Sequence, residues 1–180
     1  SVLKMLDVGA MGLIIPNIET VEQIKKLVEY GKYYPVGRRG FATTRCGGYG
    51  FVEHAVENMD EYFSLANNET MIIPQCETKG CLDNIEEIVS IEGVDGIFVG
   101  PYDLSISLGI PMQFSNPILV SAIDRILKVC KDAGKFSFIF SGSIDLAKKY
   151  LKDGFDAVTY GLDTGILVNA YRDCVKQIKE

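Results

Sequence analysis

Apolar runs of strand length, each followed by a stretch of helical period, restrict the possible folds of this sequence more than any other feature. Five such runs recur along the chain and are rich in Ile, Val and Phe; they span residues 12–16, 71–77, 96–100, 136–140 and 157–161. Nearly continuous apolar strands are typical of parallel sheets that are covered on both faces. Strands alternating with helices indicate βα units. The expected fold class is therefore α/β, with about five βα units.

The segments between these runs carry apolar stripes that predict helices. Helices are expected at residues 19–30, 53–65, 117–133, 144–152 and 164–179, and Leu82, Ile85, Ile88 and Val89 form a further stripe after the second run. Gly134 suits a C-cap for the helix that precedes it. Residues 31–52 form a long loop rich in Gly and Arg, and a loop of this length is often functional. No linker divides the chain, so residues 1–180 are interpreted as one domain or part of one.

Composition excludes several classes of partner. The net charge of −6 argues against a nucleic-acid or anionic-membrane surface, since either would need a basic footprint. The odd number of cysteines, five, includes no CxxC pair, which argues against a disulfide framework or a zinc knuckle and favours a reducing cytoplasm; they are Cys46, Cys76, Cys81, Cys130 and Cys174. No apolar run approaches the length of a membrane span, and the first residues do not resemble a leader.

Candidate functional residues follow the second and third strands. Ligands bind at the carboxyl ends of strands in parallel α/β folds. Side chains alternate along a strand, so Gln75 and Glu77 share one face and Cys76 faces the other way. The third strand runs into Gly100-Pro101-Tyr102-Asp103. Because strands joined by a crossover are usually neighbours, Glu77 and Asp103 are expected to meet above the sheet.

Two carboxylates without histidine or thiolate form an oxygen-only site that suits Mg²⁺ or Mn²⁺. Such a half-open site suits a chelating 2-oxo acid, with the cation acting as a Lewis acid. An alternative remains open, because acidic residues are common where helices start. In that interpretation Glu77 caps the following helix and Asp103 caps the turn at residues 103–109.

Other catalytic chemistries find little support. No lysine ends any of the five strands, which disfavours a Schiff-base mechanism. The single histidine, His54, follows the Gly-rich loop, where a surface or capping role is favoured over catalysis. The run Cys46 to Gly50 lacks the GK[ST] ending of a phosphate-binding loop.

The stretch IPQCETKG…GIFVGPYDLSISLG resembles the HpcH/HpaI aldolase family, in which one strand ends Gln-x-Glu-Thr and the next ends Gly-Pro-x-Asp-Leu-Ser. The segments LDVGAMGLIIPNIETVEQ, YYPVGRRGFATTRCGGYG and AVTYGLDTGIL are similar to other parts of the family, so the resemblance covers essentially the whole chain. It implies a (β/α)₈ (TIM) barrel and a class II, metal-dependent aldolase that joins pyruvate to an aldehyde or cleaves the product.

Carried over by position, the resemblance makes Glu77 and Asp103 the ligands of a divalent cation, Mg²⁺ or Mn²⁺, with Co²⁺ or Zn²⁺ as alternatives. It assigns substrate binding to Gln75, Gly100, Pro101, Tyr102 and Asp103. Arg39 and Arg45 match basic loop positions, where a structural pairing is an equal alternative for each. The implied partners are a small 2-oxo acid, an aldehyde and further copies of the chain in a homo-oligomer, a trimer or hexamer.

Departures from the family pattern limit what is implied. The family's catalytic histidine and an arginine lie on three earlier strands, so no catalytic base is expected in this chain, which is interpreted as the C-terminal part of the barrel. Five strands cannot close an eight-strand barrel, so an apolar edge is expected to need cover from missing strands or a partner. Tyr102 replaces a small residue and is expected to crowd the pocket. Two alternatives stay open: a related lyase acting on an acyl-CoA-type substrate, and a non-catalytic remnant that binds without turnover.

Overall fold

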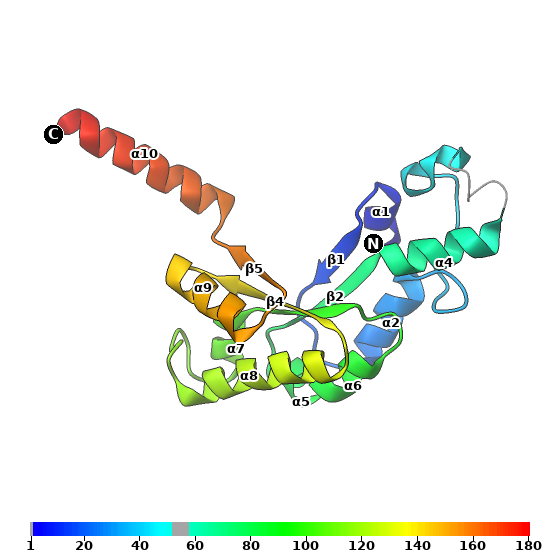
Figure 1. Ribbon diagram of the computed structural model, residues 1–180, viewed down its shortest axis with the longest axis horizontal. Coiled ribbons are helices and arrows are strands. Elements are labelled where there is room, and N and C mark those ends of the chain that lie inside the picture. The colour runs from blue at the N-terminus through cyan, green and yellow to red at the C-terminus, as the bar shows by residue number, and fades with distance from the viewer. Residues whose placement is uncertain (1, 52–57) are drawn as a thin grey trace.

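The computed structural model describes residues 2–51 and 58–180 and contains a five-stranded parallel sheet (Figure 1). The strands lie side by side in chain order, β1-β2-β3-β4-β5, and every neighbouring pair is parallel. Their bounds are β1 Gly12–Ile15, β2 Met71–Cys76, β3 Gly96–Val99, β4 Phe136–Ser141 and β5 Ala157–Tyr160. All five predicted strands are confirmed to within one residue at each end.

Helices follow the strands and cover one face of the curled sheet (Figure 1). The helical segments are α1 Val2–Asp7, α2 Val21–Gly31, η1 Arg45–Gly50, α4 Met59–Glu69, α5 Lys79–Asp83, α6 Ile85–Ser90, α7 Pro101–Ser107, α8 Pro117–Asp132, α9 Ile144–Asp153 and α10 Asp163–Lys179. The sheet and its outer helices form a curled half-barrel, as expected for part of a barrel built from βα units.

The main core lies between the outer face of the sheet and these helices. Ile97 and Val99 of β3 and Ile139 of β4 are fully buried against apolar side chains such as Ile85 of α6 and Ile126 of α8. Burying each such side chain contributes roughly 1.5–3 kcal/mol. The alternation along β3 and β4 therefore directs the opposite set of side chains, including Phe98 and Phe140, toward the inner face.

The inner face and α10 are much less covered. Ile14 of β1 and Phe136 of β4, whose side chains point to the inner face, are about half exposed. Helix α10 extends away from the rest of the protein (Figure 1) and has no buried residue. Apolar residues stand exposed along it, namely Ile166, Leu167, Val168, Tyr171, Val175 and Ile178.

Local details differ from the predicted helices. The single stripe expected after β2 is divided into α5 and α6 at Asn84, whose side-chain amide donates to the carbonyl oxygen of Gly80 at 2.8 Å. The short helices α1, η1 and α7 were not predicted; α7 includes most of the segment that was expected to be a turn at residues 103–109. The helix predicted at 53–65 is α4 in its later part, whereas residues 52–57 lie outside the described part of the chain.

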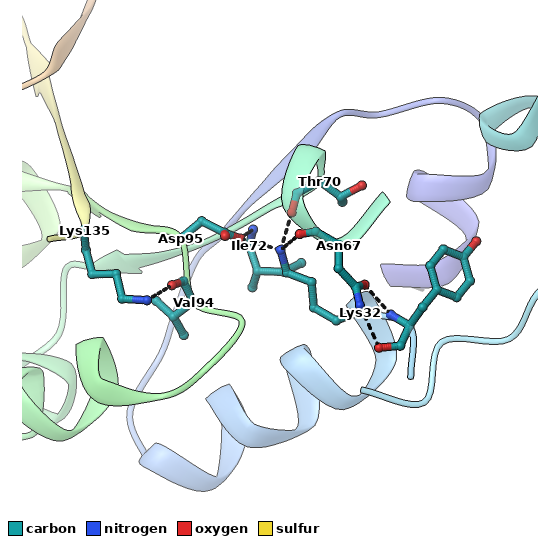
Figure 2. Close-up of polar contacts among 8 residues, drawn as sticks. Lys32, Asn67, Thr70, Ile72, Val94, Asp95 and Lys135 are labelled. Atoms are coloured by element: carbon teal, nitrogen blue, oxygen red, sulfur yellow. Dashed lines mark hydrogen bonds and ion pairs between the residues drawn. The ribbon is translucent and has the colours of Figure 1, made fainter. Parts of the chain in front are cut away.

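At the amino ends of the strands, Lys32 connects three segments of the chain (Figure 2). Its Nζ forms an ion pair of 2.8 Å with Asp95, before β3, and donates to the carbonyl oxygens of Asn67 and Thr70, before β2. Asp95 also accepts a 2.7 Å hydrogen bond from the amide of Ile72. The Lys32 side chain is only 2% exposed. The long loop thus begins with a buried charge that is fully hydrogen-bonded.

Thiol reactivity should follow burial. Cys76, Cys81 and Cys130 are buried, whereas Cys174 on α10 is exposed. Burial raises the pKa of Cys130 to about 12, and a hydrogen bond with Cys81, together with burial, raises the pKa of Cys76. Because the thiolate is the reactive form, we expect Ellman's reagent at pH 8 to label Cys174 at least about 100-fold faster than Cys130. Equal labelling rates for Cys174 and Cys130 in the native protein would contradict the burial of Cys130 in the core.

None of the helices within residues 2–51 and 58–180 has the length and apolar character needed to cross a bilayer.

Candidate active site

The carboxyl ends of β2 and β3 lie next to each other. The register pairs Gln75 with Phe98 and Cys76 with Val99, and the amide of Gly100 donates to the carbonyl oxygen of Cys76 at 3.2 Å. Cys76 is buried in the core on the helix side, while Gln75 lines a pocket on the inner side. Gln75 also donates through Nε2 to Oε2 of Glu77. These contacts agree with the prediction that Gln75 and Glu77 share a face and that Cys76 faces the other way.

Glu77 is a buried carboxylate, 5% exposed. Besides the bond from Gln75, its Oε1 accepts a 2.8 Å hydrogen bond from the backbone amide of Asn17, which follows β1. Asn17 has a φ of 56°, a left-handed conformation that asparagine tolerates better than most residues. Within the described part of the chain, Glu77 forms no ion pair. The carboxylate is therefore positioned by neutral donors, and no cationic side chain among the described residues compensates its charge.

Gly100 has no side chain, and the Glu77 carboxylate occupies the space that a side chain at this position would fill. A Cβ atom at residue 100 would lie 2.8 Å from Nε2 of Gln75 and 3.1 Å from Oε2 of Glu77. Both distances are shorter than normal contacts, so a side chain at this position would displace the polar groups. The glycine at the end of β3 thus allows β2 to present Gln75 and Glu77 beside the start of α7.

Asp103 lies in the first turn of α7 and is exposed. The interpretation of the two acids as helix caps is not supported. Thr78 is the N-cap of α5, and its hydroxyl accepts from the amide of Cys81 at 3.0 Å. Gly100 is the N-cap of α7. Neither carboxylate is therefore explained as an N-cap.

A pocket of about 400 Å³ opens at this end of the sheet. The five residues predicted to bind substrate all line it, together with Phe98, Phe140 and Leu162. Glu77 does not line the pocket directly but is bonded to Gln75, which does. Asn17, Phe140 and Leu162 were not predicted as site residues, although each lies at or just after the end of a strand, which is the signal that singles out such positions.

The donor set is compatible with a hard divalent cation. Each carboxylate oxygen of Glu77 accepts one hydrogen bond, and a carboxylate oxygen has two lone-pair positions, so coordination capacity remains. Across residues 2–51 and 58–180, no group of three or more His, Cys, Asp or Glu side chains is placed to hold a metal ion. A cation held by Glu77 and Asp103 would therefore need water and substrate oxygens to complete its shell, as Mg²⁺ commonly does.

The arginines of the long loop lie elsewhere. Arg39 is buried and forms a 3.0 Å ion pair with Asp7, which is a structural pairing. Arg45 is exposed and lines, with Arg39, a separate pocket beside the residues that precede β1 and β2. Both arginines are thus at the amino ends of the strands, opposite the candidate site. His54 lies outside the described residues.

Known proteins resemble this chain in sequence and in structure. The 2-keto-3-deoxy-L-rhamnonate aldolase of Escherichia coli O9:H4 (strain HS) is 34% identical over 169 residues, which are 93% of this chain but 61% of that protein. Among solved structures, an HpcH/HpaI aldolase from Desulfitobacterium hafniense DCB-2 has a TM-score of 0.89 at 27% identity, covering 99% of this chain and 68% of that one. The citrate synthase SbnG has a TM-score of 0.84 at 26% identity, covering 99% of this chain and 66% of that one.

The chain thus spans about three fifths of the length of the aldolase that it matches. The family model described as HpcH/HpaI aldolase/citrate lyase matches residues 1–170. With the parallel half-barrel and the strand-end carboxylates, this match shows that the chain belongs to the HpcH/HpaI aldolase/citrate lyase family.

Proposed function

We propose that this chain is part of a metal-dependent aldolase or lyase. The enzyme would form or cleave a carbon–carbon bond between a 2-oxo acid, pyruvate, and an aldehyde. The observation that carries the proposal is Glu77, a buried carboxylate without a cationic partner among the described residues. A buried charge is costly unless it is paired or coordinates a metal. Its position at a strand end, next to a pocket that Asp103 lines, supports a cation site.

In this proposal Glu77 and Asp103 hold Mg²⁺ or Mn²⁺, with Co²⁺ or Zn²⁺ as alternatives. The bound cation would supply a Lewis acid that polarises the keto oxygen of the 2-oxo acid. Gln75 would lie beside the substrate and hold the Glu77 carboxylate in place through its side-chain amide. The backbone amides of Tyr102 and Asp103, in the first turn of α7, would donate to the substrate carboxylate.

A second candidate is a binding protein without turnover. Forming the nucleophile from pyruvate requires a base that removes a methyl proton, and the lining of the described pocket includes neither histidine nor lysine. If the base of the reaction comes from residues outside this chain, the chain alone should bind the 2-oxo acid without activating it. The family resemblance supports the same expectation, since its histidine and arginine match no residue here.

Proton exchange separates these candidates. With Mg²⁺ present, an active aldolase should replace the methyl protons of pyruvate by deuterium in D₂O, which proton NMR follows directly. Exchange above the rate of a protein-free control would support turnover by this chain. Binding of pyruvate without exchange would favour the non-catalytic candidate, and absence of pyruvate binding in the presence of Mg²⁺ would refute both.

Two features support a larger assembly. β1 pairs only with β2 and β5 only with β4 within the described sheet, and residues 2–51 and 58–180 leave the apolar side chains of α10 exposed. Unpaired strand edges and apolar patches are usually covered in native proteins. We propose that these five units are the last five of an eight-unit barrel and that the complete protein is a homo-oligomer, a trimer or hexamer.

A further inference from the structure

The candidate pocket is polar on one side and apolar on the other. Gln75 of β2 and Asp103 of α7 line its polar side. Phe98 of β3, Phe140 of β4 and Leu162, which follows β5, line the remainder together with Tyr102. Since the strands are ordered β2-β3-β4-β5, polarity falls across the sheet from the carboxylates toward β5. A ligand with its acid group near Gln75 would direct its other end along the apolar side.

Tyr102 is held as part of this apolar side. Its ring packs edge-on against Phe140, with centroids 5.5 Å apart, and against Phe114 at 4.7 Å. Its hydroxyl lies above Gly142, where a Cβ atom would come within 2.5 Å of the oxygen. The ring is thus supported on two sides, and the glycine leaves room for the hydroxyl. The Tyr102 ring therefore forms a wall of the pocket in a fixed orientation.

The apolar side has few hydrogen-bonding partners for a hydroxylated ligand. The side chains of Phe98, Phe140 and Leu162 contain no hydrogen-bonding atoms, and the Tyr102 hydroxyl is the one polar side-chain group on this side of the described pocket. Several hydroxyl groups buried there would lose hydrogen bonds to water, and the single Tyr102 hydroxyl would replace only a small part of them. An aromatic or branched alkyl group would instead gain contact with three aromatic rings.

We propose that Tyr102, Phe140 and Leu162 select an apolar aldehyde, aromatic or branched alkyl, as the second substrate of this site. The inference rests on the proposed aldolase function and specifies its substrate class. In the condensation, the methyl carbon of pyruvate loses a proton and forms a bond to the aldehyde carbon, and the aldehyde oxygen gains a proton. No electron acceptor is needed. The product is a 4-hydroxy-2-oxo acid with an apolar group on C4.

Binding of stable 2-oxo acids tests this class independently of turnover. With Mg²⁺ present, calorimetry on the full chain would compare 2-oxobutanoate, 2-oxo-4-phenylbutanoate and the trihydroxylated 2-keto-3-deoxygluconate. We expect the phenyl compound to bind at least about 10-fold more tightly than 2-oxobutanoate. The hydroxylated compound should bind no more tightly than 2-oxobutanoate. Apolar pockets discriminate against added hydroxyl groups by up to about 100-fold.

Variants locate the preference within the pocket. Phe140→Ser should reduce the phenyl advantage to less than about 3-fold. Phe136→Ser is the matched control, because Phe136 lies on the same strand and face but outside the pocket, and it should keep the full advantage. Tyr102→Ala provides a second variant should Phe140→Ser fail to fold, and it should also lose most of the phenyl advantage.

The outcomes distinguish the two levels of the proposal. If none of the 2-oxo acids binds, the proposed function fails and the inference fails with it. If 2-oxobutanoate binds but the phenyl group adds no affinity, or the hydroxylated compound binds best, the proposed function stands and the apolar substrate class is refuted. Loss of the advantage in Phe136→Ser would also refute the assignment to this pocket.

Discussion

Replacing Lys32 with methionine should lower the free energy of unfolding by about 3 kcal/mol, because the substitution breaks a buried ion pair from one side. Methionine fills similar space but cannot donate to the carbonyl oxygens of Asn67 and Thr70 or pair with Asp95 (Figure 2). These acceptors would then lie near an apolar side chain. This loss is at the lower end of the range for breaking a buried ion pair, because Asp95 is 25% exposed and retains its hydrogen bond from the amide of Ile72.

Urea unfolding followed by circular dichroism measures this loss. Lys128→Met is the matched control, because Lys128 and Asp132 form an ion pair with side chains 74% and 64% exposed. Surface pairs four residues apart on a helix, as here, contribute about 0.3–0.5 kcal/mol. Combining Lys32→Met with Asp95→Asn should cost less than the sum of the single changes, since the residues share an interaction. Equal losses for Lys32→Met and Lys128→Met would show that the buried network contributes little.

The second large effect concerns Glu77→Gln. If Mg²⁺ and pyruvate bind the folded protein together, ligand present at 100 times its dissociation constant should stabilise it by about 2.7 kcal/mol, seen as a higher melting temperature. We expect Glu77→Gln to abolish this increase, because the neutral amide is a poor ligand for a hard cation. The substitution preserves shape and the acceptor for the Asn17 amide, although its NH₂ group would face the amide of Gln75.

The melting temperature without ligand separates a folding defect from a binding defect. Glu86→Gln serves as control, because Glu86 is exposed and its partner is Arg125, at 2.6 Å on the outer surface. That variant should retain the full increase with Mg²⁺ and pyruvate. A folded Glu77→Gln protein that still gains stability from the pair would remove Glu77 from the proposed cation site.

The strands were predictable because their pattern is local. Each of the five is short, apolar and followed by a helical stripe, and these features can be recognised within a few adjacent residues. The break between α5 and α6 was not predictable in this way. The apolar stripe continues through Asn84, so periodicity cannot reveal that the backbone leaves the helix there.

Candidate site residues were predictable where one rule sufficed. The rule that ligands bind at the carboxyl ends of parallel strands singled out Gln75, Glu77 and Asp103 before any contact was known. It did not reveal what surrounds them. Asn17 lies 60 residues before Glu77 yet donates to it, and the apolar side of the pocket combines residues from β3, β4 and the segment after β5.

By itself, the sequence determined the α/β class, the positions of the strands and the residues at their ends, because alternation and helical period are properties of adjacent residues. Only the tertiary structure decided which charges are compensated. Lys32, in a loop rich in Gly and Arg, is buried against Asp95, whereas Glu77 is buried beside neutral donors. Burial and pairing depend on segments far apart in the chain, and no local pattern specifies them.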